Sequence, residues 1–193
     1  MSGSGNGAAI ESLRGLRDRP FELLQRLEQR NRTAASSHTT QASPEREWVG
    51  VACRLAGEIF LVAREETREV LGYPAAVTRI PGAKAWVKGL ANVRGQLLPM
   101  LDLRQFLGSG MTNIGRNTRV IVVNHRDVPA GLVVDEVLGF RRFAEREFNA
   151  DPPPTVIRCD SYLAGAFRRG GEVWPVLSMK TLVESQSFLQ AAS

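Results

Sequence analysis

The stretch that decides the fold is Lys88-Gly-Leu-Ala-Asn-Val-Arg-Gly-Gln-Leu-Leu-Pro-Met-Leu-Asp-Leu-Arg104. Two short apolar runs flank a turn at residues 92–95, in which Gly95 can adopt the positive φ that a tight reversal requires. Pro99 lies in the middle of the second run. Because proline has no N–H to donate to a ladder, it predicts a sheet edge or a bulge at that point.

Only two charged residues, Arg94 and Asp102, lie between the two ends of this stretch. Charges amid so much apolar sequence are usually paired with a neighbour or placed for a partner. We therefore expect each of these two side chains to have a partner, inside the chain or outside it.

Short β-rich segments surround the central stretch. The expected strands are residues 48–55, 58–63, 67–71, 119–124, 129–134, 137–142, 162–168 and 172–177. Residues 58–63 are apolar on both faces, which indicates full burial or a surface that meets a partner, and we favour burial. Residues 179–189 are expected to close the chain as one helix. About ten closely spaced strands with little helix between them predict small barrels or a sandwich, not a parallel α/β sheet.

The chain divides into an extension and a domain. Residues 1–47 are expected to be a flexible extension, with a helix at residues 20–32 and a linker rich in Ser, Thr and Ala after it. An isolated helix of this length is marginal in water, so it would dock elsewhere or remain partly unfolded. Residues 48–193 form the predicted domain.

The formal net charge of +5 is the feature that most favours a different class of function, a basic β-barrel that binds nucleic acid. The excess is predicted to be diffuse because no cluster of five or more basic residues occurs, whereas nucleic-acid binders concentrate charge on one face. The aromatic content of 7% is also low for base stacking. No apolar run reaches the ~20 residues that span a bilayer and no signal peptide is evident, so a cytoplasmic location is expected.

Catalytic and metal-binding patterns are lacking in the sequence. Cys53 and Cys159 are far apart, and with two histidines in the chain they do not make the cluster of about four ligands that zinc needs. His125 and Asp127 could be two members of a triad, but no nucleophile turn accompanies them. The sequence therefore favours a protein that is not an enzyme and holds no metal or cofactor. An uncharacterised enzyme is kept as an alternative class, and it would need convergent polar groups in a pocket.

Four motifs, in order, resemble the CheW-like adaptor family of bacterial chemosensory systems. They are Leu55-Ala-Gly-Glu-Ile-Phe60, Arg68-Glu-Val-Leu-Gly-Tyr73, Asn92-Val-Arg-Gly95 with Pro99-Met-Leu-Asp-Leu103, and Ala130-Gly-Leu-Val-Val-Asp-Glu-Val137. The resemblance covers residues 48–183 and is strongest to the type IV pilus (twitching motility) branch, with a flagellar chemotaxis adaptor as the alternative. It implies a mainly β fold of two packed five-stranded SH3-like β-barrel lobes and no catalytic activity.

The resemblance also implies partners. They are a methyl-accepting-type (PilJ-like) chemoreceptor and a CheA-like (ChpA-like) histidine kinase, which would place the chain at the inner membrane through receptor arrays. The implied receptor-binding residues are Thr67, Glu69, Val70, Lys88, Gly89 and Arg94. The expected kinase-binding residues are Ile59 and Leu61.

Three finer expectations follow from the same resemblance. Glu69 and Arg94 should form a salt bridge on the receptor-facing surface. Residues 1–47 exceed a minimal adaptor, and they are candidates for binding a further partner or for self-association. Ser178 stands where the family commonly has an acidic or amide residue, but a serine there can still cap the last helix.

Overall fold

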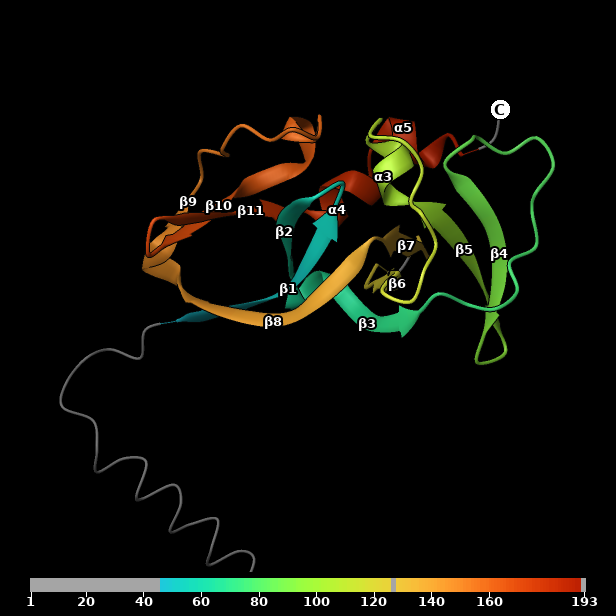
Figure 1. The fold of residues 1–193 in the computed structure, drawn as a ribbon, viewed down its shortest axis with the longest axis horizontal. Coiled ribbons are helices and arrows are strands. Elements are labelled where there is room, and N and C mark those ends of the chain that lie inside the picture. Colours follow the sequence, from blue (N-terminus) through green and yellow to red (C-terminus); the bar gives the residue numbers. More distant parts are fainter. Residues whose placement is uncertain (1–45, 126–127, 192–193) are drawn as a thin grey trace, which may run out of the picture. The chain divides into compact units, whose positions relative to one another are not determined.

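A computed structural model describes residues 46–125 and 128–191 of the chain (Figure 1). The expected helix at residues 20–32, its linker and Asp127 lie outside the described residues. Residues Arg46–Ser193 form one compact unit. No helix in the described part of the chain is long and apolar enough to cross a membrane.

Two β-sheets make up this unit. The first has the strand order β8-β1-β2-β11-β10-β9 and the second the order β3-β6-β7-β5-β4. The strands of the first sheet are β1 (Glu47–Leu55), β2 (Glu58–Ala63), β8 (Glu136–Ala144), β9 (Phe148–Asn149), β10 (Leu163–Arg169) and β11 (Glu172–Leu177). The strands of the second sheet are β3 (Thr67–Gly72), β4 (Val87–Val93), β5 (Gln96–Asp102), β6 (Arg119–Val123) and β7 (Gly131–Val134).

Short helices connect or follow the strands. They are the 3-10 turns η1 (Arg64–Glu66), η2 (Glu145–Glu147) and η3 (Asp160–Tyr162), and the α-helices α3 (Leu103–Phe106), α4 (Met179–Val183) and α5 (Gln186–Leu189). The single helix expected at residues 179–189 is therefore wrong. Ser185 interrupts it, because its hydroxyl accepts the backbone N–H of Phe188 and starts a new helix. The predicted cap on the preceding helix is confirmed, since Ser178 Oγ accepts the N–H of Thr181 at 3.1 Å.

The mainly β class and the division into two strand groups are confirmed, with six and five strands where five and five were expected. Closed barrels are not confirmed. In the described ranges, the end strands β8 and β9 of the first sheet do not pair with each other, nor do β3 and β4 of the second. The additional strand, β9, has only two residues and pairs with Ala166 and Phe167 of β10.

The central stretch folds as the predicted hairpin of β4 and β5. Its two-residue turn, Arg94-Gly95, has φ angles of 52° and 83°, and positive φ at both positions fits the right-handed twist of the flanking strands. Asn92 Oδ1 accepts the N–H of Gly95 at 2.8 Å and holds the turn. Gly95 was expected to have positive φ, but the left-handed conformation of Arg94 was not foreseen.

The prediction of a sheet edge at Pro99 is confirmed. Pro99 pairs with Leu90 of β4, whereas β7 pairs with β5 only from Met100 to Asp102. The proline therefore lies on the part of β5 that has a neighbour on one side alone, where its missing N–H removes no second ladder.

The two sheets share one hydrophobic core. Its largest buried cluster contains Phe60 of β2, Ile121 of β6 and Leu132 of β7, together with Leu182 of α4. Each sheet also has a smaller hydrophobic cluster of its own. The cluster of the first sheet includes Phe167, and that of the second sheet includes Met100. Because the main cluster draws on both sheets, neither sheet can move away from the other without exposing it.

Asp102 is buried at the end of β5 and joins four parts of the chain. Its carboxylate accepts the N–H of Gln105 at 3.1 Å, which caps α3, and both the N–H and the hydroxyl of Thr112, at 3.0 and 2.9 Å. Lys88 Nζ on β4 lies 3.5 Å from Asp102 Oδ2. The expectation that Asp102 has a partner is confirmed, and the partners are internal.

Asp102→Ala should lower the free energy of unfolding by about 3 kcal/mol, because it leaves buried donors unsatisfied and Lys88 without its counter-charge. Urea denaturation measures this change. Asp151→Ala, at an exposed residue, is the matched control and should change stability by less than about 0.5 kcal/mol. Equal transition midpoints for the two variants would show that the Asp102 network is not needed for stability.

Candidate functional site

The Glu69–Arg94 ion pair is the centre of the candidate site. Arg94 Nη1 lies 2.7 Å from Glu69 Oε2, so the predicted salt bridge is confirmed. Glu69 belongs to β3, at one end of the second sheet, and Arg94 belongs to the turn after β4, at the other end. The two edge strands of the second sheet share no backbone ladder, and this ion pair connects them through side chains. The Arg94 side chain is 74% exposed and that of Glu69 is 24% exposed.

Two grooves flank β3. The first, here the hairpin groove, has a volume of about 500 Å³ and lies between β3, the β4–β5 hairpin and the segment after β6. Its lining residues are Arg68, Glu69, Val93, Arg94, Gln96, Leu97, Leu98, Val122, Val123, Asn124, His125 and Pro129. The second, here the inter-sheet groove, has a volume of about 340 Å³. Its lining residues are Val51, Arg64, Thr67, Arg68, Glu69, Val70, Val137, Gly139 and Phe140.

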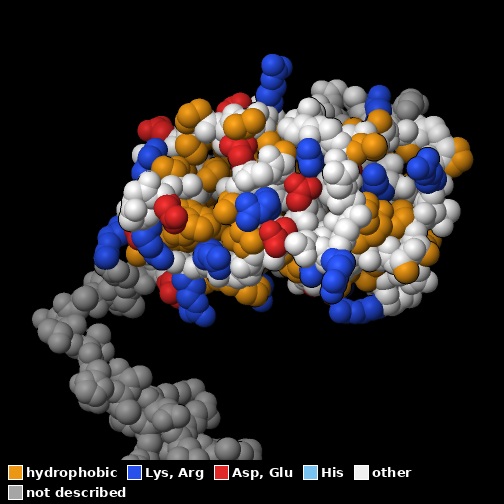
Figure 2. Space-filling view, in the orientation of Figure 1, with side chains coloured by type: hydrophobic (Ala, Val, Ile, Leu, Met, Phe, Trp, Pro, Cys, Tyr) orange, Lys and Arg blue, Asp and Glu red, His pale blue; other side chains and the backbone are white. Residues whose placement is uncertain are grey.

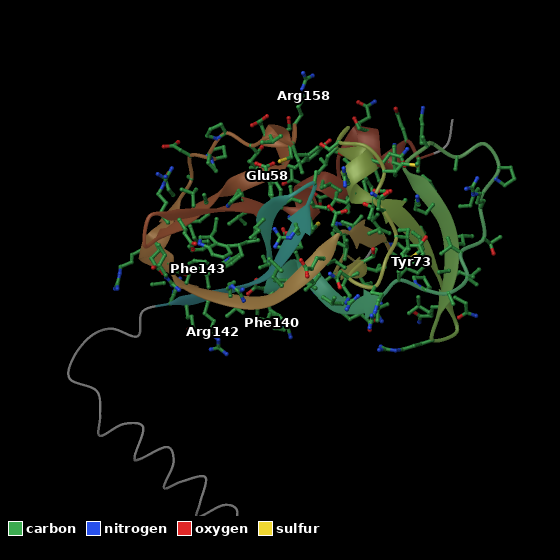
Figure 3. All side chains as sticks on the ribbon, in the orientation of Figure 1. Glu58, Tyr73, Phe140, Arg142, Phe143 and Arg158 are labelled. Atoms are coloured by element: carbon green, nitrogen blue, oxygen red, sulfur yellow. The ribbon has the colours of Figure 1, made fainter. Side chains whose placement is uncertain are left out.

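The surface around the grooves mixes positive charge with apolar side chains. Lys and Arg side chains are scattered over the face seen in Figure 2, and some of them lie at its lower side near β3 and the β4–β5 hairpin. Phe140 projects from β8 at the same lower side (Figure 3) and is 60% exposed. Single exposed apolar residues are common on protein surfaces, so Phe140 by itself identifies no interface, but it adds apolar surface beside the inter-sheet groove.

Four of the six expected receptor-binding residues line the grooves. Glu69 lines both, Arg94 lines the hairpin groove, and Val70 lines the inter-sheet groove. Thr67 also lines the inter-sheet groove but is nearly buried, and its hydroxyl donates to the carbonyl of Ala63 at 3.2 Å. Thr67 thus supports the start of β3 more than it offers surface.

Lys88 and Gly89 line neither groove, and the structure gives both an internal role. The Lys88 ammonium is directed to the buried Asp102. Gly89 has φ of 137°, and a Cβ atom there would lie 2.1 Å from the carbonyl oxygen of Thr78. This close approach allows the two hydrogen bonds of 2.8 Å between Thr78 and Leu90 that cover the outer edge of β4.

Ile59 and Leu61, the expected kinase-binding residues, differ in exposure. Leu61 is completely buried in the core cluster of the first sheet, which leaves it no surface with which to contact a partner. Ile59 is half-buried and packs against the same cluster. The favoured prediction that residues 58–63 are buried holds for Phe60, Leu61 and Val62.

The described residues contain no group of three or more His, Cys, Asp or Glu side chains that could hold a metal ion. Burial, with a smaller effect from Asp135, raises the pKa of the Cys53 thiol to about 12, so the thiol is protonated near neutral pH. His125 Nε2 lies 3.1 Å from Glu184 Oε1 and thereby contacts the segment after α4.

Sequence reasoning missed two residues of the site, Arg68 and Phe140. Arg68 lies between two expected residues, yet only the strand register shows that it lines both grooves. Phe140 is an apolar residue in a strand, and its apolar character by itself predicts burial. An adjacent pair of arginines, Arg141 and Arg142, was the one local hint of a surface position.

Two sheets with a common core and exposed grooves define a mainly β binding scaffold. The family model of the CheW-like domain matches residues 49–187, and the chain belongs to this family. It is thus a CheW-like scaffold of chemosensory signal transduction.

Individual relatives agree with the family assignment. The chain is 40% identical to Protein PilI of Pseudomonas aeruginosa over 173 residues, which covers 90% of this chain and 96% of that protein. It is 37% identical to Protein FrzA of Myxococcus xanthus, over 59% of this chain and 68% of the relative. The crystal structure of the scaffolding protein TtCheW from Thermoanaerobacter tengcongensis superimposes with a TM-score of 0.64 at 25% identity, over 74% of this chain and 96% of that one.

Gly89→Ala should lower the free energy of unfolding by roughly 2–4 kcal/mol, since the new methyl group meets a backbone carbonyl and the backbone conformation disfavours it. Gly72→Ala, at the end of β3, is the control, because a Cβ atom there meets nothing within 4 Å. Thermal and urea denaturation measure both variants. A Gly89→Ala protein as stable as Gly72→Ala would overturn the structural role assigned to Gly89.

Proposed function

We propose that this chain is a non-catalytic adaptor that couples a PilJ-like chemoreceptor to a ChpA-like histidine kinase, with control of type IV pili as its output. The similarity to PilI over nine-tenths of the chain supports the pilus branch. The alternative, a flagellar chemotaxis adaptor, has support from Chemotaxis protein CheW of Klebsiella aerogenes, which is 29% identical over 69% of this chain. Contact with the receptor would hold the adaptor at arrays on the inner membrane.

The observation that carries the proposal is the Glu69–Arg94 pair, whose two side chains line the hairpin groove. An exposed ion pair contributes only ~0–1 kcal/mol to stability, so stability is a poor reason for this arrangement. Arg94 moreover occupies the left-handed region at φ of 52°, which is uncommon for residues other than glycine. A non-glycine residue held in such a conformation on an exposed turn is consistent with a binding role for its side chain.

The geometry suggests what the pair does. Glu69 fixes one nitrogen of the Arg94 guanidinium and leaves the other donors of this planar fork available to a partner. Receptor contact at Glu69, Val70 and Arg94, with Ile59 as a kinase contact in the other sheet, would place the two partners on one rigid scaffold. Signals would then pass through altered packing at these contacts, without a covalent step.

Arg94→Ala should keep the fold but reduce receptor-dependent kinase activity at least about tenfold, because the oriented guanidinium is lost. The measurement is autophosphorylation of the kinase reconstituted with the receptor fragment and the adaptor. Glu69→Arg combined with Arg94→Glu should restore part of this activity by re-forming the pair in reverse.

Arg142→Ala is the matched control, because it removes another exposed ion pair, Arg142–Glu47 at 2.9 Å, from the first sheet. This variant should couple receptor and kinase normally. Unfolding free energies of all variants should lie within about 1 kcal/mol of the unmodified protein. The assignment fails if Arg94→Ala supports kinase activity as well as Arg142→Ala does.

A further inference from the structure

Strand β3 contains a β-bulge, and Arg68 is its extra residue. Thr67 pairs with Val123 of β6 and Glu69 pairs with Val122, so two steps along β3 match one step along β6. Arg68 therefore has no partner across the ladder. A bulge of this kind bends the strand and redirects a side chain, and bulges are frequent next to functional sites.

The bulge presents a positive charge that nothing in the described chain neutralises. Arg68 is exposed, and it makes no hydrogen bond or ion pair with any described residue. The adjacent carboxylate, Glu69, is engaged by Arg94. Arg68 nevertheless lines both the hairpin groove and the inter-sheet groove, so it stands on the ridge between them.

The part of the chain around Arg68 also has an excess of positive charge. Residues 64–134, which contain all five strands of the second sheet, include ten Lys or Arg and five Asp or Glu residues. This excess equals the formal net charge of the whole chain, +5. The positive surplus therefore falls in the part of the sequence that carries the grooves, spread over 71 residues without a cluster of five or more basic residues.

Apolar side chains lie on both sides of Arg68. Leu97, 68% exposed, borders the hairpin groove, and Phe140, 60% exposed, borders the inter-sheet groove. A segment laid across β3 would thus meet an apolar surface, then a guanidinium, then a second apolar surface. The complementary ligand carries a carboxylate with apolar residues on either side of it.

We propose that Arg68 determines the specificity of the receptor-facing surface by binding a Glu or Asp carboxylate in an otherwise apolar segment of the receptor. This inference rests on the proposed receptor contact and adds the chemistry of the ligand. The planar guanidinium can hold a carboxylate through two parallel hydrogen bonds, which a lysine cannot do.

The test measures binding of the full chain to the purified cytoplasmic fragment of a PilJ-like receptor by isothermal titration calorimetry. Arg68→Ala should raise the Kd about tenfold, and Arg68→Lys should fall between Ala and the unmodified chain. Because the lost contact is ionic, the affinity of Arg68→Ala should also depend less steeply on salt between 50 and 300 mM. Arg158→Ala, at an exposed arginine after β9 in the first-sheet part of the chain (Figure 3), is the control and should leave the Kd within twofold.

A double-mutant cycle then identifies the carboxylate. Each Glu and Asp of the receptor tip is changed in turn to Gln or Asn. The substitution at the carboxylate that binds Arg68 should reduce the affinity as much as Arg68→Ala does, and the two substitutions together should reduce it little further. If the unmodified chain binds the fragment but Arg68→Ala binds as well as Arg158→Ala, this inference fails and the proposed function stands. If the unmodified chain does not bind, both fail.

Discussion

Burial of one hydrophobic cluster between the two sheets is the constraint on which the rest of the structure depends. Phe60, Ile121 and Leu182 come from β2, β6 and α4, yet they lie in the same cluster. Protein interiors are closely packed, so a relative movement of the sheets would open cavities in this cluster. The grooves on either side of β3 are therefore held in a fixed relation, which suits the proposed role of a scaffold that keeps two partners in register.

The site lies at the two edge strands of the second sheet. These strands, β3 and β4, do not pair, and the gap between β3 and the β4–β5 hairpin is crossed by the Glu69–Arg94 pair. The hairpin itself is held from the inside by Asp102, whose network includes Lys88 on β4. A buried carboxylate thus fixes the base of the hairpin, and an exposed ion pair fixes its tip.

Much of the fold could be predicted from sequence, because short apolar runs and turn residues act locally. Residues 58–63 and the turn at Gly95 are examples, and the Glu69–Arg94 pair followed from family resemblance. What could not be predicted depends on contacts between distant segments. The bulge at Arg68 is set by the register with β6, and the inward direction of Lys88 is set by the burial of Asp102. Neither leaves a local sequence pattern.

The central claim is that the chain physically bridges receptor and kinase. Sedimentation velocity of fluorescently labelled kinase, mixed with the receptor fragment in the presence or absence of the full chain, tests it most directly. The account predicts that the kinase sediments with the receptor only when the chain is present, and that all three proteins are found in the fast-moving boundary. Equal association of kinase and receptor without the chain, or a boundary that lacks it, would contradict the account.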